Sequence, residues 1–255
     1  MILPRFRWIE LRDAQALDCA NERGSRPGDG ANSAMPKHVF DALVNHLRGH
    51  VPTEYDNPSP MLLNVIMLRI TCILSNPEET VVLVPEWSII NAAAWGEKPP
   101  MCDVVHHLVI RGSERAAVSI TFSPISTLQG NNDFMDKLHM AHIFEAKTMP
   151  GFEDALPYAV KQMAYWCKMT GRRYSKAAIY FDFKWRFLTY DAVGLPGEDR
   201  PLVRIMGGMG RPWYVLLTAQ DIDATLGLLL DMVENASEEN LQFFRPRDDL
   251  IGLLN

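Results

Sequence analysis

The chain has 255 residues, of which 47% are hydrophobic and 22% are charged, so it is long enough to bury a substantial core. Its 25 basic and 31 acidic residues give a net charge of 25 − 31 = −6, which argues against a protein that grips long nucleic acids through many phosphate contacts. The four cysteines are far apart in the sequence and include no Cys-x-x-Cys pair, which argues against a disulfide scaffold or a structural zinc site.

The apolar segments are too short or too interrupted for a signal peptide or a membrane span. Arg5, Arg7 and Glu10 interrupt the N-terminus, and the longest apolar stretch, 61–74, contains Asn64 and Arg69. We therefore expect an intracellular protein, cytoplasmic or nuclear, with no membrane partner.

The first 35 residues differ from the rest of the chain. Residues 21–34 are rich in Gly, Ser, Asn and charge and offer almost nothing to bury. The sequence therefore predicts an N-terminal arm and flexible connector over 1–35, followed by a single α/β domain over 36–255.

Two helices are predicted at the start of this domain. Helical spacing of Phe40, Leu43, Val44 and Leu47 predicts an amphipathic helix over 36–48. A second helix is predicted from Ser59 as N-cap to a point before Pro77. This second helix is apolar nearly all round, so we expect it to be buried.

The middle and end of the chain alternate between strand and helix patterns. Residues 86–95 are ambiguous, and a polar loop is expected over 126–137. A long helix is predicted over 151–171 and a last one after Thr218, where Asp221 completes a capping-box arrangement. Strands are predicted at 80–84, 102–110, 116–122, 140–146, 177–183, 186–190, 202–206 and 213–217.

The segment HIFEAK, 142–147, carries the pattern most suggestive of chemistry. Residues two apart on a strand share a face, so Glu145 and Lys147 are expected to emerge side by side. Asp103, at the start of an earlier strand, offers a second carboxylate. Two carboxylates suit Mg²⁺ or Mn²⁺, and a lysine beside them can orient the attacking water in phosphodiester hydrolysis.

Several segments together resemble the PD-(D/E)XK nuclease-like domains found widely in fungal proteins. The resemblance rests on the order of PEWSIINAAAW (85–95), Asp103 with its strand, HIFEAK, KQMAYW (161–166) and RPWYVLLT (211–218), and it covers roughly 80–235. Cys102 stands where the family pattern has proline. The resemblance implies a restriction-endonuclease-like fold, a mixed central sheet flanked by helices.

The same resemblance assigns roles to individual residues. Asp103, Glu145 and Lys147 would be catalytic, and Gln162 would be the glutamine of the following helix. Glu86, with Trp87, would belong to the family's first core helix and would add a third metal ligand beside Asp103 and Glu145. The implied cofactor is Mg²⁺ or Mn²⁺, and the implied activity is a metal-dependent nuclease.

Other interpretations stay open at this stage. Asp133 and Asp136 are rivals of Asp103 for the second carboxylate. The acidic balance and the many aromatic and Met residues favour a repurposed fold that acts on a small apolar metabolite, or a binding module that no longer cuts. Nucleic acid is thus a possible partner that the charge does not support, and a homodimer through apolar helices is a further alternative.

The histidines give a weaker metal signal. His46 and His50 are spaced i, i+4, but the helix lacks the Glu of a zinc-protease motif, so we expect both to face water near a helix end. His106 and His107 are adjacent in a predicted strand, so one of them must point inward and is expected to be a core residue.

Overall fold

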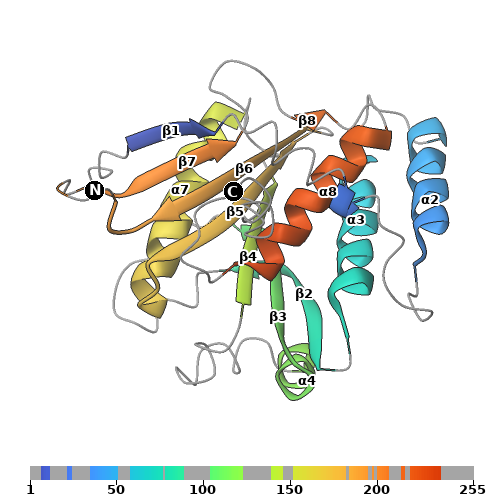
Figure 1. Ribbon diagram of the computed structural model, residues 1–255, viewed down its shortest axis with the longest axis horizontal. Coiled ribbons are helices and arrows are strands. Elements are labelled where there is room, and N and C mark those ends of the chain that lie inside the picture. The colour runs from blue at the N-terminus through green and yellow to red at the C-terminus, as the bar shows by residue number, and fades with distance from the viewer. Residues whose placement is uncertain are drawn as a thin grey trace, which may run out of the picture.

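The computed structural model describes a mixed α/β protein, in which one central sheet carries helices on both faces (Figure 1). The described residues are 7–11, 22–24, 35–50, 58–76, 78–88, 104–122, 139–145, 152–181, 184–194, 197, 200–206, 214–215 and 219–236. In chain order the elements are β1 (Arg7–Leu11), α2 (Lys37–His50), α3 (Pro58–Leu74), β2 (Glu79–Ser88), β3 (Val104–Ser113), α4 (Glu114–Phe122), β4 (His139–Glu145), α7 (Phe152–Thr170), β5 (Tyr174–Phe181), β6 (Lys184–Asp191), β7 (Leu202–Met206), β8 (Tyr214–Val215) and α8 (Ala219–Glu234).

The strands lie in the order β1-β7-β6-β5-β4-β3-β2, and β8 pairs with β6. The pairs β1/β7 and β4/β5 are parallel, and the other pairs are antiparallel. A parallel connection needs a crossover, which α7 supplies between β4 and β5. Since α7 follows the strand that contains Glu145, the fold presents the strand–helix–strand unit that the sequence predicted there.

Each face of the sheet has its own core. On the face that we call the α8 face, α3 and α8 pack against side chains such as Val109, Ala178 and Phe187. On the opposite face, called the α7 face, α4 and α7 pack against side chains such as Leu108, Ile179 and Leu188. Alternation along each strand explains the division, because neighbouring residues point to opposite faces.

The segment 116–122 is helical, so the strand predicted there is wrong. Val118, Ile120 and Thr121 gave it a β-branched pattern, but the start of α4 satisfies helix-capping chemistry. The backbone N–H of Ala116 donates to Ser113 Oγ at 3.4 Å, and Glu114 lies in the first turn. The cap therefore outweighs the weak strand propensity of the segment.

Glu86 and Trp87 lie in strand β2, which corrects their predicted place in a first core helix. Pro85 pairs with His107 and Trp87 pairs with Val105, so the ladder to β3 continues through both residues. The helix that precedes the first strands of this unit is instead α3.

Helix α3 is amphipathic rather than buried all round. Leu63 and Ile70 are fully enclosed, but Met61 is 50% exposed and Leu68 is 49% exposed. The expectation of complete burial failed because α3 covers the sheet with one side only. Arg69 is buried on this helix and donates to the backbone oxygen of Met35, which ties the start of the domain to α3.

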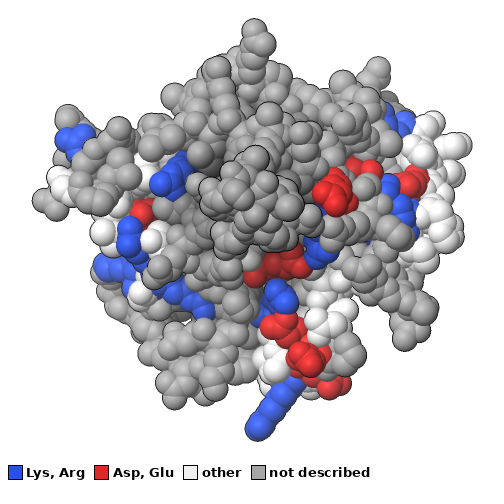
Figure 2. Space-filling model, in the orientation of Figure 1, with Lys and Arg blue, Asp and Glu red and all other residues white. Residues whose placement is uncertain are grey.

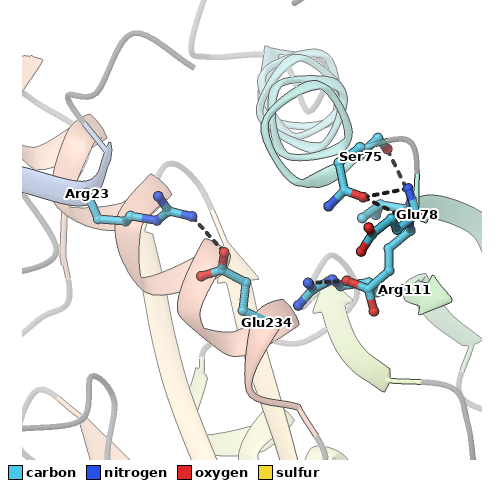
Figure 3. Close-up of polar contacts among 8 residues, drawn as sticks. Arg23, Ser75, Glu78, Arg111 and Glu234 are labelled. Atoms are coloured by element: carbon cyan, nitrogen blue, oxygen red, sulfur yellow. Dashed lines mark hydrogen bonds and ion pairs between the residues drawn. The ribbon is translucent and has the colours of Figure 1, made fainter. Parts of the chain in front are cut away.

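Part of the predicted N-terminal arm belongs to the sheet. Residues 7–11 form β1, which pairs with β7, and Arg23 Nη2 donates to Glu234 Oε1 of α8 at 2.6 Å (Figure 3). The prediction of an arm is therefore wrong for these residues. The sequence pattern of residues 7–11 is too short to reveal that their partner strand, β7, lies almost two hundred positions later in the chain.

The turn between α3 and β2 is built from side-chain contacts that Figure 3 shows near Ser75 and Glu78. Asn76 Oδ1 accepts from the backbone N–H groups of Glu78 and Glu79 at 2.8 Å each. Glu79 also pairs with Arg111 across the β2/β3 ladder. These contacts fix the entry into the three antiparallel strands that lead to Glu145.

None of the helices in the described ranges is both long and apolar enough to cross a membrane.

Candidate active site at the end of strand β4

Glu145 is the last residue of β4 and lies at an edge of the sheet where several strands end. In the register it pairs with Tyr180 of β5, and two residues earlier Ile143 pairs with both His107 of β3 and Ala178 of β5. Ala178 belongs to the core of the α8 face. Strand alternation therefore gives position 145 to the α8 face of the sheet.

Two buried aromatic residues continue the row of Glu145 across the sheet. Tyr180 pairs with Trp185 of β6, both are fully enclosed, and their ring centroids are 4.7 Å apart. Phe187 lies beyond Trp185, with the ring centroids at 6.2 Å. The side of the candidate site toward β5 and β6 is thus an apolar, tightly packed wall.

His107 is buried, as predicted for one histidine of the adjacent pair. It is 9% exposed and lies on the same face of the sheet as position 145, in the row of Ile143. The sequence marked this histidine only as a core residue. Its proximity follows from the β3/β4 register, which the sequence does not reveal.

Two of the predicted catalytic residues, Asp103 and Lys147, lie outside the described residues, as do the rival carboxylates Asp133 and Asp136. Within the part of the chain that the structure describes, no group of three His, Cys, Asp or Glu residues is placed to hold a metal ion.

Glu86 is not brought to the face of Glu145. Its neighbours Pro85 and Trp87 pair with His107 and Val105, which share the face of position 145. Position 86 therefore belongs to the opposite face, because neighbouring strand residues alternate. The fold thus gives position 86 no shared face with Glu145.

Gln162 also lies on the other side of the sheet. It is buried on α7, with 8% of its surface exposed, among helix residues that pack on the α7 face. The same helix packs on this face through the buried residues Leu156, Ala159, Val160, Met163 and Cys167. Tyr158, one turn before Gln162 on the same helix, is exposed.

The paired histidines of α2 face water, as predicted. His46 and His50 are exposed, their rings stack at 4.1 Å, and His50 Nδ1 lies 3.0 Å from the backbone oxygen of His46. The two histidines lie at the C-terminal end of α2.

No protein-family model, curated protein or solved structure matches this chain. The resemblance to PD-(D/E)XK nuclease-like domains therefore stays a prediction, and the case for a function rests on geometry.

The α8 face also carries a buried ion pair that the sequence did not predict. Lys176 Nζ of β5 lies 3.5 Å from Asp231 Oδ2 of α8, and both side chains are under 5% exposed. Asn235 Nδ2 donates to Asp231 Oδ1 at 2.7 Å. The spacing of Lys176 with the inward residues Ala178 and Tyr180 is the signal that would have found it.

A second ion pair closes the far end of β6. Arg173 Nε and Nη2 donate to Asp191 Oδ1 and Oδ2 at 2.8 and 3.0 Å. Burial alone would raise the pKa of Asp191, but these bonds and those from the backbone N–H groups of Val193 and Gly194 hold that pKa below its usual value. Both carboxylate oxygens of Asp191 are therefore occupied by hydrogen bonds from Arg173.

Proposed function

We propose that this chain is a metal-dependent phosphodiester hydrolase built on a restriction-endonuclease-like mixed sheet. In this proposal Asp103 and Glu145 provide the carboxylates that hold Mg²⁺ or Mn²⁺, and Lys147 orients the attacking water. Glu86 and Gln162 are left out, because the register and the packing give them to the opposite face.

The observation that carries the proposal is the register of the β3/β4 ladder. The pair His107↔Ile143 fixes an antiparallel alignment. Continued in steps of two, that alignment would set position 105 opposite Glu145 and position 103 opposite position 147. Directly opposite residues have Cβ atoms about 5 Å apart, and diagonal neighbours stay within reach of long side chains. Asp103, Glu145 and Lys147 would then share one face of the sheet.

The position of this edge supports a site as well. β4 and β5 are parallel and end together, at Glu145 and Phe181, where α7 begins its crossover region. In open α/β sheets ligands bind beyond the carboxyl ends of the parallel strands. Glu145 thus lies at the edge where this architecture favours binding.

The donor set fits a hard divalent cation, since Mg²⁺ and Mn²⁺ prefer carboxylate oxygens and water. When bound, such an ion supplies an activated water and neutralises charge on a phosphodiester. The two carboxylates provide oxygen ligands, and the Lys147 ammonium donates a hydrogen bond that orients the water. The enclosed row of Tyr180 and Trp185 keeps bulk water away on one side.

Nuclease assays test this proposal. Single- and double-stranded DNA and RNA are incubated with the protein and Mg²⁺ or Mn²⁺. Lys147→Ala and Glu145→Gln should each reduce cleavage by roughly 10²-fold or more. Glu114→Gln, at an exposed position at the start of α4, serves as the matched carboxylate control and should cut like wild type. Equal cleavage by all variants would contradict the assignment.

A second candidate is a repurposed site for a small apolar ligand, and the aromatic wall favours it. Trp185 is fully enclosed, and its indole N–H makes no hydrogen bond within the described part of the chain. A compact ligand with an acceptor group would suit that wall better than a sugar-phosphate chain. If the protein binds Mn²⁺ through Glu145 but cuts none of the four nucleic acids, this candidate takes precedence.

A further inference from the structure

Three polar residues form a row across the α8 face at the opposite end of the strands from Glu145. Lys176 of β5 pairs with Thr189 of β6, and Thr189 pairs with Arg204 of β7. Directly paired residues share a face, so the three side chains stand next to one another over about 10 Å. Lys176 is four positions from Tyr180, so this row lies roughly 13 Å along the sheet from the row of Glu145.

Two members of the row have unused hydrogen-bonding capacity. Thr189 is fully enclosed, and its Oγ1 has no hydrogen-bond partner among the described residues. Arg204 is partly exposed and makes no hydrogen bond or ion pair with any described side chain. Burial lowers the pKa of Arg204, and nearby Asp191 only partly offsets that cost. A hydroxyl and a guanidinium next to each other thus both lack an acceptor.

The neighbouring carboxylates are already engaged. Asp191 accepts two hydrogen bonds from Arg173, and Asp231 accepts from Asn235 and lies beside Lys176. Among these described ionic groups, Lys176, Arg173 and Arg204 carry three positive charges, against two negative ones. Asp191 is the carboxylate that acts electrostatically on Arg204, and it already accepts two hydrogen bonds from Arg173.

Further arginines surround this end of the sheet. Arg172 and Arg173 directly precede β5, and Arg200 precedes β7. These strands begin at the same end of the sheet, where Asp191 of β6 pairs with both Tyr174 and Leu202. Figure 2 shows basic side chains gathering on the left of the molecule, where β7 and β6 lie in Figure 1. Clustered arginines recognise carboxylates and phosphates, because the guanidinium donates in a fixed fork.

We propose that Arg204 and Thr189 form an oxyanion-binding site that takes a carboxylate or phosphate group of a ligand. The oxyanion accepts from the Arg204 guanidinium and from the Thr189 hydroxyl, and the Lys176 ammonium lies behind them as a buried positive charge. Arg204 is the partly exposed member, so the ligand enters from its side. This site uses other residues than the proposed hydrolase site and does not depend on it.

The experiment is a calorimetric titration of the full chain with inorganic phosphate and, separately, with acetate. Sodium chloride keeps the ionic strength constant and, titrated alone, reports non-specific binding. We expect saturable binding of at least one oxyanion. Arg204→Gln should weaken it at least tenfold and Thr189→Val several-fold, whereas Arg48→Gln, an exposed arginine on α2, should leave it unchanged.

The two oxyanions distinguish the ligand group. Binding of phosphate alone indicates a phosphoryl ligand, binding of acetate alone indicates a carboxylate, and both results support the site. Thr189→Val should also raise the melting temperature without added anion, because it removes a buried hydroxyl that lacks a partner. Absence of saturable binding to both oxyanions, or equal affinity in wild type and Arg204→Gln, would overturn the proposal.

Discussion

The buried ion pair between Lys176 of β5 and Asp231 of α8 links the last helix to the sheet. Both side chains are almost fully enclosed, at 3% and 4% exposure. Removal of one partner from a buried ion pair leaves a charge without its compensation, which costs more than the pair contributes. The pair therefore stabilises the packing of α8 against β5.

Asp231→Ala should lower the free energy of unfolding by about 3 kcal/mol, because the Lys176 ammonium stays buried without this carboxylate. Urea unfolding measures the change. Glu234→Ala is the matched control on the same helix, since its pair with Arg23 is about a quarter exposed, and it should cost under about 1 kcal/mol. The double variant Lys176→Met, Asp231→Leu should recover most of the loss. A similar small cost for both single variants would contradict the account.

Asp191 makes stability depend on pH in a defined direction. Its folded-state pKa is lowered below the unfolded value of about 3.9, so its contribution is complete above that value and is lost as the pH falls through the folded pKa. The free energy of unfolding of the wild type should therefore fall more steeply between about pH 5 and about pH 2 than that of Asp191→Asn. Parallel curves from chemical denaturation at several pH values would show that the Arg173 contact has no such effect.

Residue roles were predictable where a local pattern sufficed. Alternation within the β3 sequence predicted an inward histidine, and His107 is buried. The row of Lys176, Thr189 and Arg204 was not predictable, because its members lie on three strands and meet only through the sheet register. Glu86 was misassigned for the same reason, since the face it occupies depends on its partner strand.

At the scale of elements, helix α3 shows that an apolar sequence pattern does not by itself predict which side of a helix is buried. Its sequence is apolar on nearly every side, yet the sheet covers only one of them, so Leu63 is fully enclosed and Leu68 is half exposed. No feature of the helix sequence marks which side will face water. That choice depends on where β2, α2 and α8 lie, because all three contact α3.

Two substitutions of one residue type in α3 test this arrangement. Leu63→Ala should reduce the free energy of unfolding by roughly 2 to 5 kcal/mol, because it removes buried methyl groups and leaves a cavity. Leu68→Ala should change it by less than about 1 kcal/mol, since the side chain is already half in water. Both positions are helical, so propensity is matched. Thermal or urea unfolding that gave equal losses would mean that α3 is covered on both sides.

Helices and strands with long, strong patterns were predicted well, and short ones were not. The long helix after Glu145 and the strand pattern from 174 to 206 agree with α7, β5, β6 and β7. Helix α4 was mistaken for a strand because the Ser113 cap was overlooked in a β-branched segment. A capping residue can thus decide a nine-residue element.

At the scale of the whole molecule, one mixed sheet separates two cores. The sequence predicted a mixed α/β architecture, but it did not predict that residues 7–11 would extend the sheet beside β7. Long-range strand pairing is invisible to local patterns. The β2/β3/β4 register gives position 86 to the face opposite position 145, and Gln162 is buried on α7, on that same opposite face.

The most direct test of the hydrolase proposal is a crystal structure with Mn²⁺, read by the anomalous scattering of the metal. We predict an anomalous peak about 2.1 Å from a carboxylate oxygen of Glu145 and of Asp103, with Lys147 within hydrogen-bond reach of a metal-bound water. The peak should vanish in Glu145→Gln. A structure in which Asp103 and Lys147 lie beyond a water-bridged distance from Glu145, with no metal between them, would contradict the central claim.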